Sequence, residues 1–166
     1  MLYEYCVLLI FPFALIYAGI SDAMSFTISN KISLVLIAGF ILLVPFSGLT
    51  LAEIGSHVFV GFLMLIVGFI LFARGCFGGG DAKLIAATSL WLGPEYTGMF
   101  LLFAAFYGGI LSLVIMKIYS TPLPTFLSNQ KWLVNYQTGA AAIPYGIAIG
   151  LSGLSVYPYS HWLGLI

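Results

Sequence analysis

Charged residues are scarce in this 166-residue chain, which has five basic and five acidic side chains, 6% of the total. The formal net charge is zero and Lys and Arg form no run, so the basic patch that nucleic-acid binding requires is missing. Cysteine is also rare, because Cys6 and Cys76 are the only two and stand far apart in no Cys-x-x-Cys pattern. The sequence therefore predicts neither a zinc site nor a disulfide framework.

Two common kinds of hydrolase are excluded by motifs that the sequence lacks. It contains neither the Gly-x-Ser-x-Gly turn of serine hydrolases nor the His-Glu-x-x-His pair of metalloproteases. We therefore expect no metal and no other cofactor in the chemistry of this chain.

Apolar residues are abundant instead: 62% of the chain is hydrophobic and the mean hydropathy is +1.15, which excludes an ordinary soluble domain. A membrane span needs about 20 residues, so the chain has room for about six spans and for no additional soluble domain. We predict an all-α polytopic membrane protein, with residues 1–166 as a single domain surrounded by lipid. The expected spans are approximately Leu2–Ile20, Ile32–Phe46, Ile54–Phe72, Ala82–Leu92, Tyr96–Ile118 and Ile143–Tyr157.

Two of these spans need comment. The first lacks a basic segment before it, carries Glu4 and is long for the apolar part of a signal peptide, so we interpret it as a retained span. The fourth, Ala82–Leu92, is short. It either extends back through the preceding glycines or forms a short helix in a thinned or protein-lined region.

The few charges separate by side of the membrane. Six spans place the loops Ser21–Lys31, Ala73–Asp81 and Tyr119–Ala142 on one side, and the termini with the turns around Ser47–Glu53 and Gly93–Glu95 on the other. The positive-inside rule makes the first side cytoplasmic, so both termini are expected outside the cytoplasm. The basic residues that fall on this cytoplasmic side are Lys31, Arg74, Lys83, Lys117 and Lys131.

The acids separate in the same way, and the separation identifies a candidate pair. Glu4, Glu53 and Glu95 fall on the outer side, and only Asp22 and Asp81 fall on the cytoplasmic side. A carboxylate at membrane depth costs about 2.5–3.5 kcal/mol on insertion scales, so such residues are functional candidates. Simple capping of a helix at the interface is the alternative for Asp81, but it does not account for Asp22.

Two carboxylates close together disfavour simultaneous ionisation, so such a pair holds one shared proton. One member can then take a proton from water while the other donates to a carbonyl oxygen, as in aspartic proteases. The histidines His57 and His161 both fall on the outer side and offer no competing site. We therefore predict Asp22 and Asp81 as a catalytic pair.

Three glycines, Gly78, Gly79 and Gly80, precede Asp81. Glycine adopts backbone conformations barred to other residues, and its missing side chain lets an extended peptide approach the main chain. We expect these glycines to shape a substrate loop, with a plain linker as the alternative. Lys83 follows two positions after Asp81, on a different helix face, and is interpreted as an interfacial anchor, as is Arg74.

Other patterns indicate membrane packing. Gly146 and Gly150 form a Gly-x-x-x-Gly pattern, which lets a neighbouring helix approach closely, and we interpret it as packing rather than chemistry. Trp132 and Tyr136 suggest that residues 127–137 lie at the cytoplasmic interface, as an anchored linker or as a place where substrate docks.

The stretch Gly78-Gly79-Gly80-Asp81-Ala82-Lys83-Leu84 resembles the GxGD motif of intramembrane aspartyl proteases, and in particular that of type IV prepilin peptidases. Asp22, followed by Thr27-Ile28-Ser29-Asn30-Lys31-Ile32-Ser33, is similar to the first catalytic Asp of that family and the Ile-Pro-Asn stretch after it. Pro144-Tyr145-Gly146-Ile147-Ala148 resembles a third stretch near the family's C-terminus. Ser29 stands where the family often has Pro, so the loop after Asp22 is expected to bend differently.

The resemblance implies that Asp22 and Asp81 cleave a prepilin or pseudopilin between a short basic leader and a hydrophobic helix, at the cytoplasmic face of the inner membrane. Long bifunctional members also methylate the new N-terminus and carry an N-terminal region with paired cysteines. This chain lacks that region, so we expect a peptidase without methylation, similar to the short branch that serves Flp/Tad-type pili. Archaeal preflagellin peptidases share the motifs, so that function stays an alternative. Two alternatives from other classes are a small ion-coupled transporter and a non-catalytic scaffold.

Overall fold

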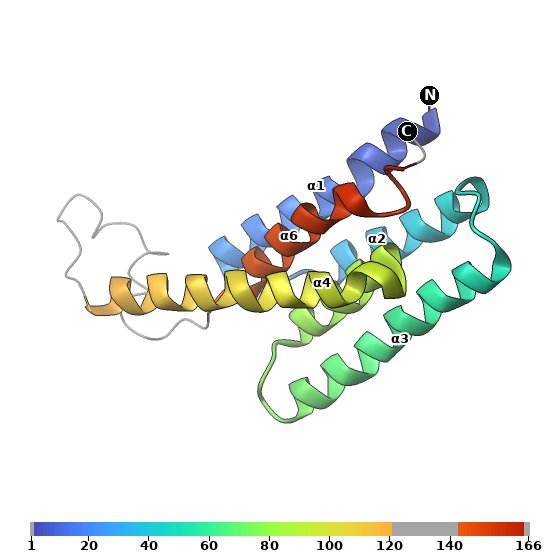
Figure 1. The fold of residues 1–166 in the computed structure, drawn as a ribbon. Coiled ribbons are helices and arrows are strands. Elements are labelled where there is room, and N and C mark those ends of the chain that lie inside the picture. The colour runs from blue at the N-terminus through green and yellow to red at the C-terminus, as the bar shows by residue number, and fades with distance from the viewer. Residues whose placement is uncertain (1, 121–142, 165–166) are drawn as a thin grey trace.

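The computed structural model describes residues 2–120 and 143–164, and over these residues it contains helices and no strand. Helices occupy all six predicted runs, which confirms the all-α fold (Figure 1). Three helical segments are long and apolar enough to cross a membrane, namely Tyr3–Ser25, Leu51–Ala73 and Gly79–Lys117, and a shorter apolar segment covers Asn30–Phe46.

Helix α1 (Leu2–Ser25) continues five residues beyond the predicted end of the first span. It ends at Phe26, which adopts a left-handed conformation with φ of 53° and donates its N–H to the Asp22 carbonyl at 2.9 Å, as a helix C-cap does. Asp22 therefore lies in the last turn of a helix and not in the predicted loop. The prediction missed this turn because Ser21 and Asp22 interrupt the apolar run without ending the helix.

Helix α2 (Asn30–Leu43) begins at the N-cap residue Ser29 and continues into the 3-10 turn η1 (Val44–Phe46). Ser29 has φ of −65° and ψ of 134°, a conformation that proline also adopts. The backbone here is therefore compatible with the proline found in the family, and the expectation of a different bend stays a prediction. The Ser29 side chain instead accepts a hydrogen bond from the Lys31 N–H at 3.3 Å.

Helix α3 (Leu51–Ala73) begins with a capping box, in which Thr50 and Glu53 each satisfy a backbone N–H of the other. It packs closely on the next helix through two glycines spaced two turns apart. A Cβ at Gly61 would lie 3.0 Å from Leu90 Cβ, and one at Gly68 would lie 2.8 Å from Ala82 Cβ. The missing side chains thus allow the backbones to approach, as is common between membrane helices.

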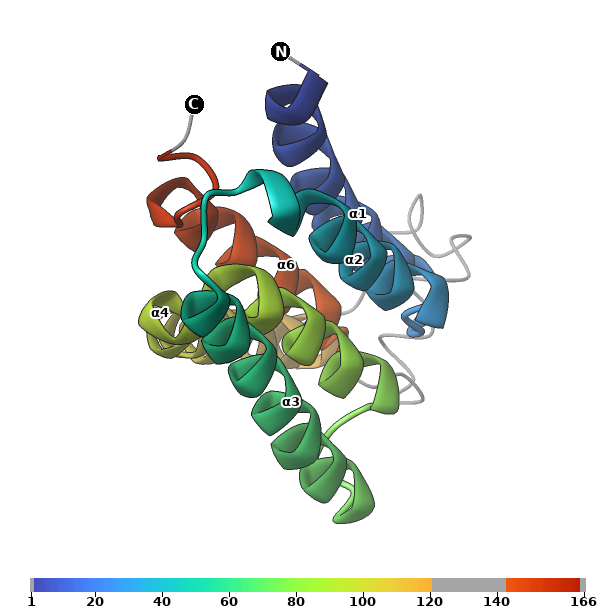
Figure 2. The same ribbon diagram turned by 90° about the vertical axis from the view of Figure 1, so that its right-hand side faces the viewer.

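Helix α4 (Gly79–Ser120) reverses direction at Gly93, so its two halves lie side by side (Figures 1 and 2). Gly93 has φ of 71° and ψ of −178°, a combination essentially restricted to glycine, and Pro94 starts the second half. The turn expected at Gly93–Glu95 is therefore confirmed. Because Pro94 has no N–H, the Leu90 carbonyl lacks a helical partner, and His57 Nδ1 occupies that place at 2.9 Å.

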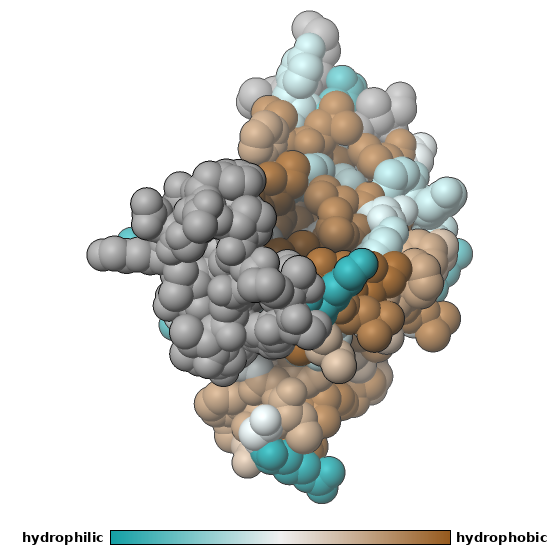
Figure 3. All heavy atoms as spheres, turned by 90° about the vertical axis from the view of Figure 1, so that its left-hand side faces the viewer, coloured by the Kyte–Doolittle hydropathy of each residue, from teal (hydrophilic) through white to brown (hydrophobic). Residues whose placement is uncertain are grey.

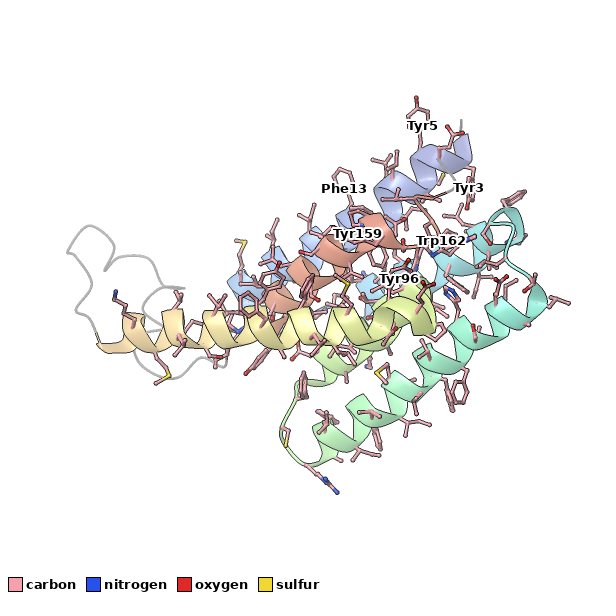
Figure 4. The ribbon with its side chains drawn as sticks, in the orientation of Figure 1. Tyr3, Tyr5, Phe13, Tyr96, Tyr159 and Trp162 are labelled. Carbon is pink, nitrogen blue, oxygen red and sulfur yellow. The ribbon has the colours of Figure 1, made fainter. Side chains whose placement is uncertain are left out.

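Helix α6 (Tyr145–Val156) lies between α1 and the second half of α4 and ends in the 3-10 turn η2 (Tyr157–Tyr159) (Figures 1 and 2). Buried polar groups join the helices near this end of the bundle. Trp91 Nε1 donates to the Leu36 carbonyl at 2.7 Å, and Trp162 Nε1 donates to the Trp91 carbonyl at 2.7 Å. Figure 4 shows Trp162 at the end of the bundle where the chain begins and ends.

The outer surface is apolar. Phe62 and Phe69 of α3, and Leu102 and Leu113 of α4, each expose more than half of their side-chain area. Figure 3 shows hydrophobic side chains over much of one face, interrupted by few hydrophilic ones. A soluble protein rarely exposes so much contiguous apolar surface, and the prediction of a membrane protein is confirmed.

The topology gives the bundle two ends. We call the end where α1 finishes and α2, α4 and α6 begin the Asp22 end, and the opposite end the terminal end. The basic residues on the described elements belong to the Asp22 end: Lys31, Arg74, Lys83 and Lys117. The acids Glu4, Glu53 and Glu95 belong to the terminal end. Lys131, Trp132 and Tyr136, for which we predicted an interfacial position, lie outside the described residues.

Candidate active site

Asp22 is buried at the contact between α1 and α6, with 5% of its surface exposed. Its Oδ2 accepts a hydrogen bond of 2.7 Å from the backbone N–H of Gly146, in the first turn of α6. The N–H groups of a first helical turn have no partner within the helix, and the preceding residue, Pro144, makes no side-chain cap. The Asp22 carboxylate of α1 therefore accepts a hydrogen bond from an N–H group in the first turn of α6 that has no partner within its own helix.

Asp81 is half-buried in the first turn of α4. Its carboxylate turns back over Gly78, where a Cβ would lie 2.7 Å from Asp81 Oδ2. This placement is compatible with the capping interaction considered as the alternative for Asp81. Such a cap uses one part of the carboxylate's accepting capacity, since an ionised carboxylate has about four lone-pair sites. Capping therefore does not exclude chemistry at the same side chain.

The fold brings the two aspartates together although 58 positions separate them in the chain. Asp22 lies in the last turn of α1 and Asp81 in the first turn of α4, and both belong to the Asp22 end of the bundle. Ile28 lies between the elements that hold them: its backbone oxygen would be 3.2 Å from a Cβ at Gly80, and its Cδ1 would be 2.8 Å from a Cβ at Gly146. One loop residue thus fills the contact between the starts of α4 and α6.

Hydroxyl groups and a lysine fix the loop that carries Ile28. Ser21 Oγ donates to the Thr27 carbonyl at 3.1 Å, and the hydroxyl groups of Ser25 and Thr27 share a hydrogen bond of 2.9 Å. Lys83 Nζ donates to Asn30 Oδ1 at 2.8 Å. Lys83 therefore ties α4 to the start of α2, a role that the sequence did not indicate.

The glycines before Asp81 act through their small size and not through backbone conformation. The glycines with positive φ among the described residues are Gly48, Gly75 and Gly93, so the conformational role expected for Gly78, Gly79 and Gly80 is wrong. A Cβ on Gly78 would lie 2.7 Å from the Asp81 carboxylate, and a Cβ on Gly80 would lie 3.0 Å from the Ile28 Cβ. The start of α4 needs small residues because the loop after α1 and the carboxylate occupy the space.

A cavity of about 360 Å³ opens between the two halves of α4 and α6. Phe77 and Tyr145, with ring centroids 5.9 Å apart, stand at the positions directly before Gly78 and Gly146. Further along, small side chains such as Ala104, Gly108 and Ala148 line its wall. This apolar hollow borders α4, which carries Asp81, and α6, whose Gly146 bonds to Asp22, and neither aspartate lines it.

Other candidate chemistry is absent from the part of the chain that the structure describes. No group of three or more His, Cys, Asp and Glu side chains there could hold a metal ion. Cys6 and Cys76 are both free thiols. His57 and His161 bond to the carbonyls of Leu90 and Ser47 at the terminal end, far along the bundle from the aspartates.

Comparison with known proteins is consistent with this geometry. The model of the type IV leader peptidase family matches residues 9–113, well over half of the chain and both aspartates. The chain belongs to the type IV leader peptidase family. No solved structure matches it.

A prepilin leader peptidase/N-methyltransferase of Legionella pneumophila is 31% identical over 86 residues. The match covers 52% of this chain and 24% of that relative, so the chain spans about a quarter of the curated relative's length. The sequence prediction of the family is confirmed, and Ile28 and the backbone of Gly146 are the parts of the site that it missed. The only signal for Gly146 was its place in the third family-like stretch.

Proposed function

We propose that this chain is a membrane-embedded aspartyl endopeptidase that removes the leader peptide of a prepilin or pseudopilin, with Asp22 and Asp81 as its catalytic pair. The observation that carries the proposal is the position of two aspartates from distant parts of the chain at the same end of an apolar bundle, Asp22 in the last turn of α1 and Asp81 in the first turn of α4, in a chain of the type IV leader peptidase family. The family model includes both positions.

The chemistry follows from two carboxylates that share one proton. The ionised member takes a proton from a water molecule, whose oxygen bonds to the scissile carbonyl carbon, while the protonated member donates to the carbonyl oxygen. When the C–N bond breaks, the leaving amine takes up a proton and the carboxylic acid product forms. This sequence requires neither a covalent intermediate nor a metal.

We propose that cleavage takes place at the cytoplasmic face of the inner membrane. Lys31, Arg74 and Lys83 belong to the same end of the bundle as the aspartates, and an excess of basic residues marks the cytoplasmic side. Both termini of the described chain then lie outside the cytoplasm.

The substrate, in this proposal, approaches over Gly78, Gly79 and Gly80. The nearest atoms to a Cβ at Gly79 would belong to the Phe72 ring, at 3.4 Å, so a shift of that ring would let an extended peptide come close to the backbone. The apolar hollow beside Phe77 and Tyr145 suits the hydrophobic segment that follows the leader. We further propose that the substrates are Flp-like pilins and that the new N-terminus is released without methylation.

The test is co-expression of the chain with a Flp-like prepilin, with the mass of the processed pilin measured. Asp22→Asn and Asp81→Asn are expected to abolish cleavage while the protein still inserts into the membrane, because Asn is isosteric with Asp but cannot ionise. Glu95→Gln, which neutralises an acid at the terminal end, is the matched control and should cleave normally.

Each outcome bears on a separate part of the proposal. Normal processing by either Asp→Asn variant would refute the catalytic pair. A product heavier by one methyl group would refute the absence of methylation while leaving the peptidase intact. Cleavage of an archaeal preflagellin but not of prepilins would show that the proposed substrate is wrong and that the chain is a preflagellin peptidase.

A further inference from the structure

We infer that Gly146 is a positioning residue for Asp22: its backbone N–H and its lack of a side chain together fix the Asp22 carboxylate in the site. The inference rests on the proposed function for its catalytic meaning, although the geometric part stands without it. It assigns to the third family-like stretch a physical task within this chain.

The first part of the argument is the hydrogen bond. Gly146 N–H donates to Asp22 Oδ2 at 2.7 Å, and both groups are buried. A bond from a backbone amide to an ionised carboxylate is shorter and stronger than one between neutral groups. Because Oδ2 accepts this proton, the shared proton of the pair, when Asp22 holds it, belongs on Oδ1.

The second part is the space that glycine leaves. A Cβ on residue 146 would lie 2.8 Å from Asp22 Cβ, 2.8 Å from Oδ2 and 2.8 Å from Ile28 Cδ1. Gly146 is helical and not among the glycines with positive φ, so its backbone conformation would suit any residue. The requirement for glycine is therefore steric, and the atoms that impose it belong largely to Asp22.

The third part separates this task from helix packing. Gly150, one turn further along α6, would place a Cβ 2.9 Å from the Leu15 carbonyl of α1, so it allows the two backbones to approach. The two glycines of the Gly-x-x-x-Gly pattern thus have different neighbours. Gly150 contacts helix backbone, and Gly146 contacts a carboxylate.

A stability cycle tests the geometry independently of activity. Gly146→Ala should lower the unfolding midpoint of the purified protein in detergent, and this loss should largely disappear in an Asp22→Gly background. Asp22→Gly is preferred to Asp22→Ala because Ala would keep the Cβ that the new methyl group meets. Gly150→Ala is the matched control, and it should lower the unfolding midpoint by the same amount in the wild-type and Asp22→Gly backgrounds. Equal losses for Gly146→Ala in the two backgrounds would overturn the inference.

A kinetic measurement on the full chain in membranes tests the catalytic meaning. Gly146→Ala should lower kcat by about 100-fold, the loss expected when a catalytic group moves by about 1 Å. KM for the prepilin should stay near its normal value, because Gly146 contacts Asp22 and not the substrate. Equal kcat in folded wild type and Gly146→Ala would refute the positioning role.

The two experiments keep this inference apart from the proposed function. If the chain cleaves no prepilin but the cycle shows coupling between positions 22 and 146, the geometric inference holds and the proposed function fails. If Asp22→Asn abolishes cleavage but the cycle shows no coupling and kcat is unaffected in Gly146→Ala, the proposed function holds and this inference fails.

Discussion

The hydrogen bond between His57 and the reversal of α4 leads to a quantitative prediction. The Leu90 carbonyl would bond to the N–H four residues later in a continuous helix, but that residue is Pro94 and has none. Since a carbonyl oxygen only accepts, the imidazole carries its proton on Nδ1 and donates it at 2.9 Å. His57 is 7% exposed, so water does not replace this donor.

The variant is His57→Phe, which keeps an aromatic ring against Phe40, whose ring is stacked on the imidazole at 5.9 Å, and removes the donor. A buried acceptor left without a partner costs about 1–3 kcal/mol, and we expect the free energy of unfolding to fall by this amount. Activity should not change in the folded fraction, because His57 lies at the terminal end of the bundle.

The assay is unfolding in mixed detergent micelles, followed by tryptophan fluorescence, since Trp91 and Trp162 are fully buried near this end. His57→Asn and His57→Ala form a control pair that excludes a purely steric effect of the larger ring. Both shorten the side chain, but only Asn retains a donor near the place of Nδ1, so His57→Asn should be the more stable of the two.

Two results would refute this reasoning. If His57→Phe unfolds within about 0.5 kcal/mol of the wild type, a difference typical of neutral surface changes, the bond does not stabilise the turn. If His57→Phe abolishes cleavage without loss of stability, the histidine takes part in the chemistry and the separation of the two ends is wrong.

Three further substitutions test other contacts. Gly93→Ala should destabilise the protein by at least about 1–3 kcal/mol, the cost of a strained backbone, because its methyl group would also overlap the neighbouring imidazole; a melting point equal to that of wild type would contradict this. Gly68→Val should separate α3 from Ala82 and cost about 1–3 kcal/mol by overpacking, measured by the same unfolding assay. Lys83→Met removes a bond to Asn30 and should reduce cleavage by less than about tenfold, since an exposed bond contributes about 0.5–1.5 kcal/mol; complete loss of cleavage would assign Lys83 to the catalytic site.

The sequence predicted the features that depend on the number of apolar runs and on the polar or helix-breaking residues between them. Six apolar runs with short connections require that the end of α1 and the start of α4 share one side of the bundle, so Asp22 and Asp81 could be placed together without coordinates. The turn at Gly93 and Pro94 was predictable for the same reason, because few residues other than glycine and proline interrupt so apolar a segment.

The parts that the sequence did not predict depend on contacts between distant segments. Ile28 is an ordinary apolar residue, and its position between Gly80 and Gly146 follows from the packing of three elements. The glycine run before Asp81 pointed correctly to a need for small residues, but its backbone is helical at Gly79 and Gly80. Whether a glycine supplies conformational freedom or space is decided by its neighbours, which local sequence does not contain.

The unequal lengths of the helices have a consequence for the lipid around them. Helix α2 has 14 residues and α6 has 12, so at 1.5 Å per residue they are about 21 Å and 18 Å long, against a hydrocarbon core of about 30 Å. The first half of α4, from Gly79 to Leu92, is as short as α2, whereas α1 and α3 have 24 and 23 residues. A span shorter than the hydrocarbon core is accommodated by local thinning of the bilayer. The short helices all begin at the Asp22 end, so a bilayer thinned around them has its surface closer to the two aspartates, whose proposed chemistry consumes water.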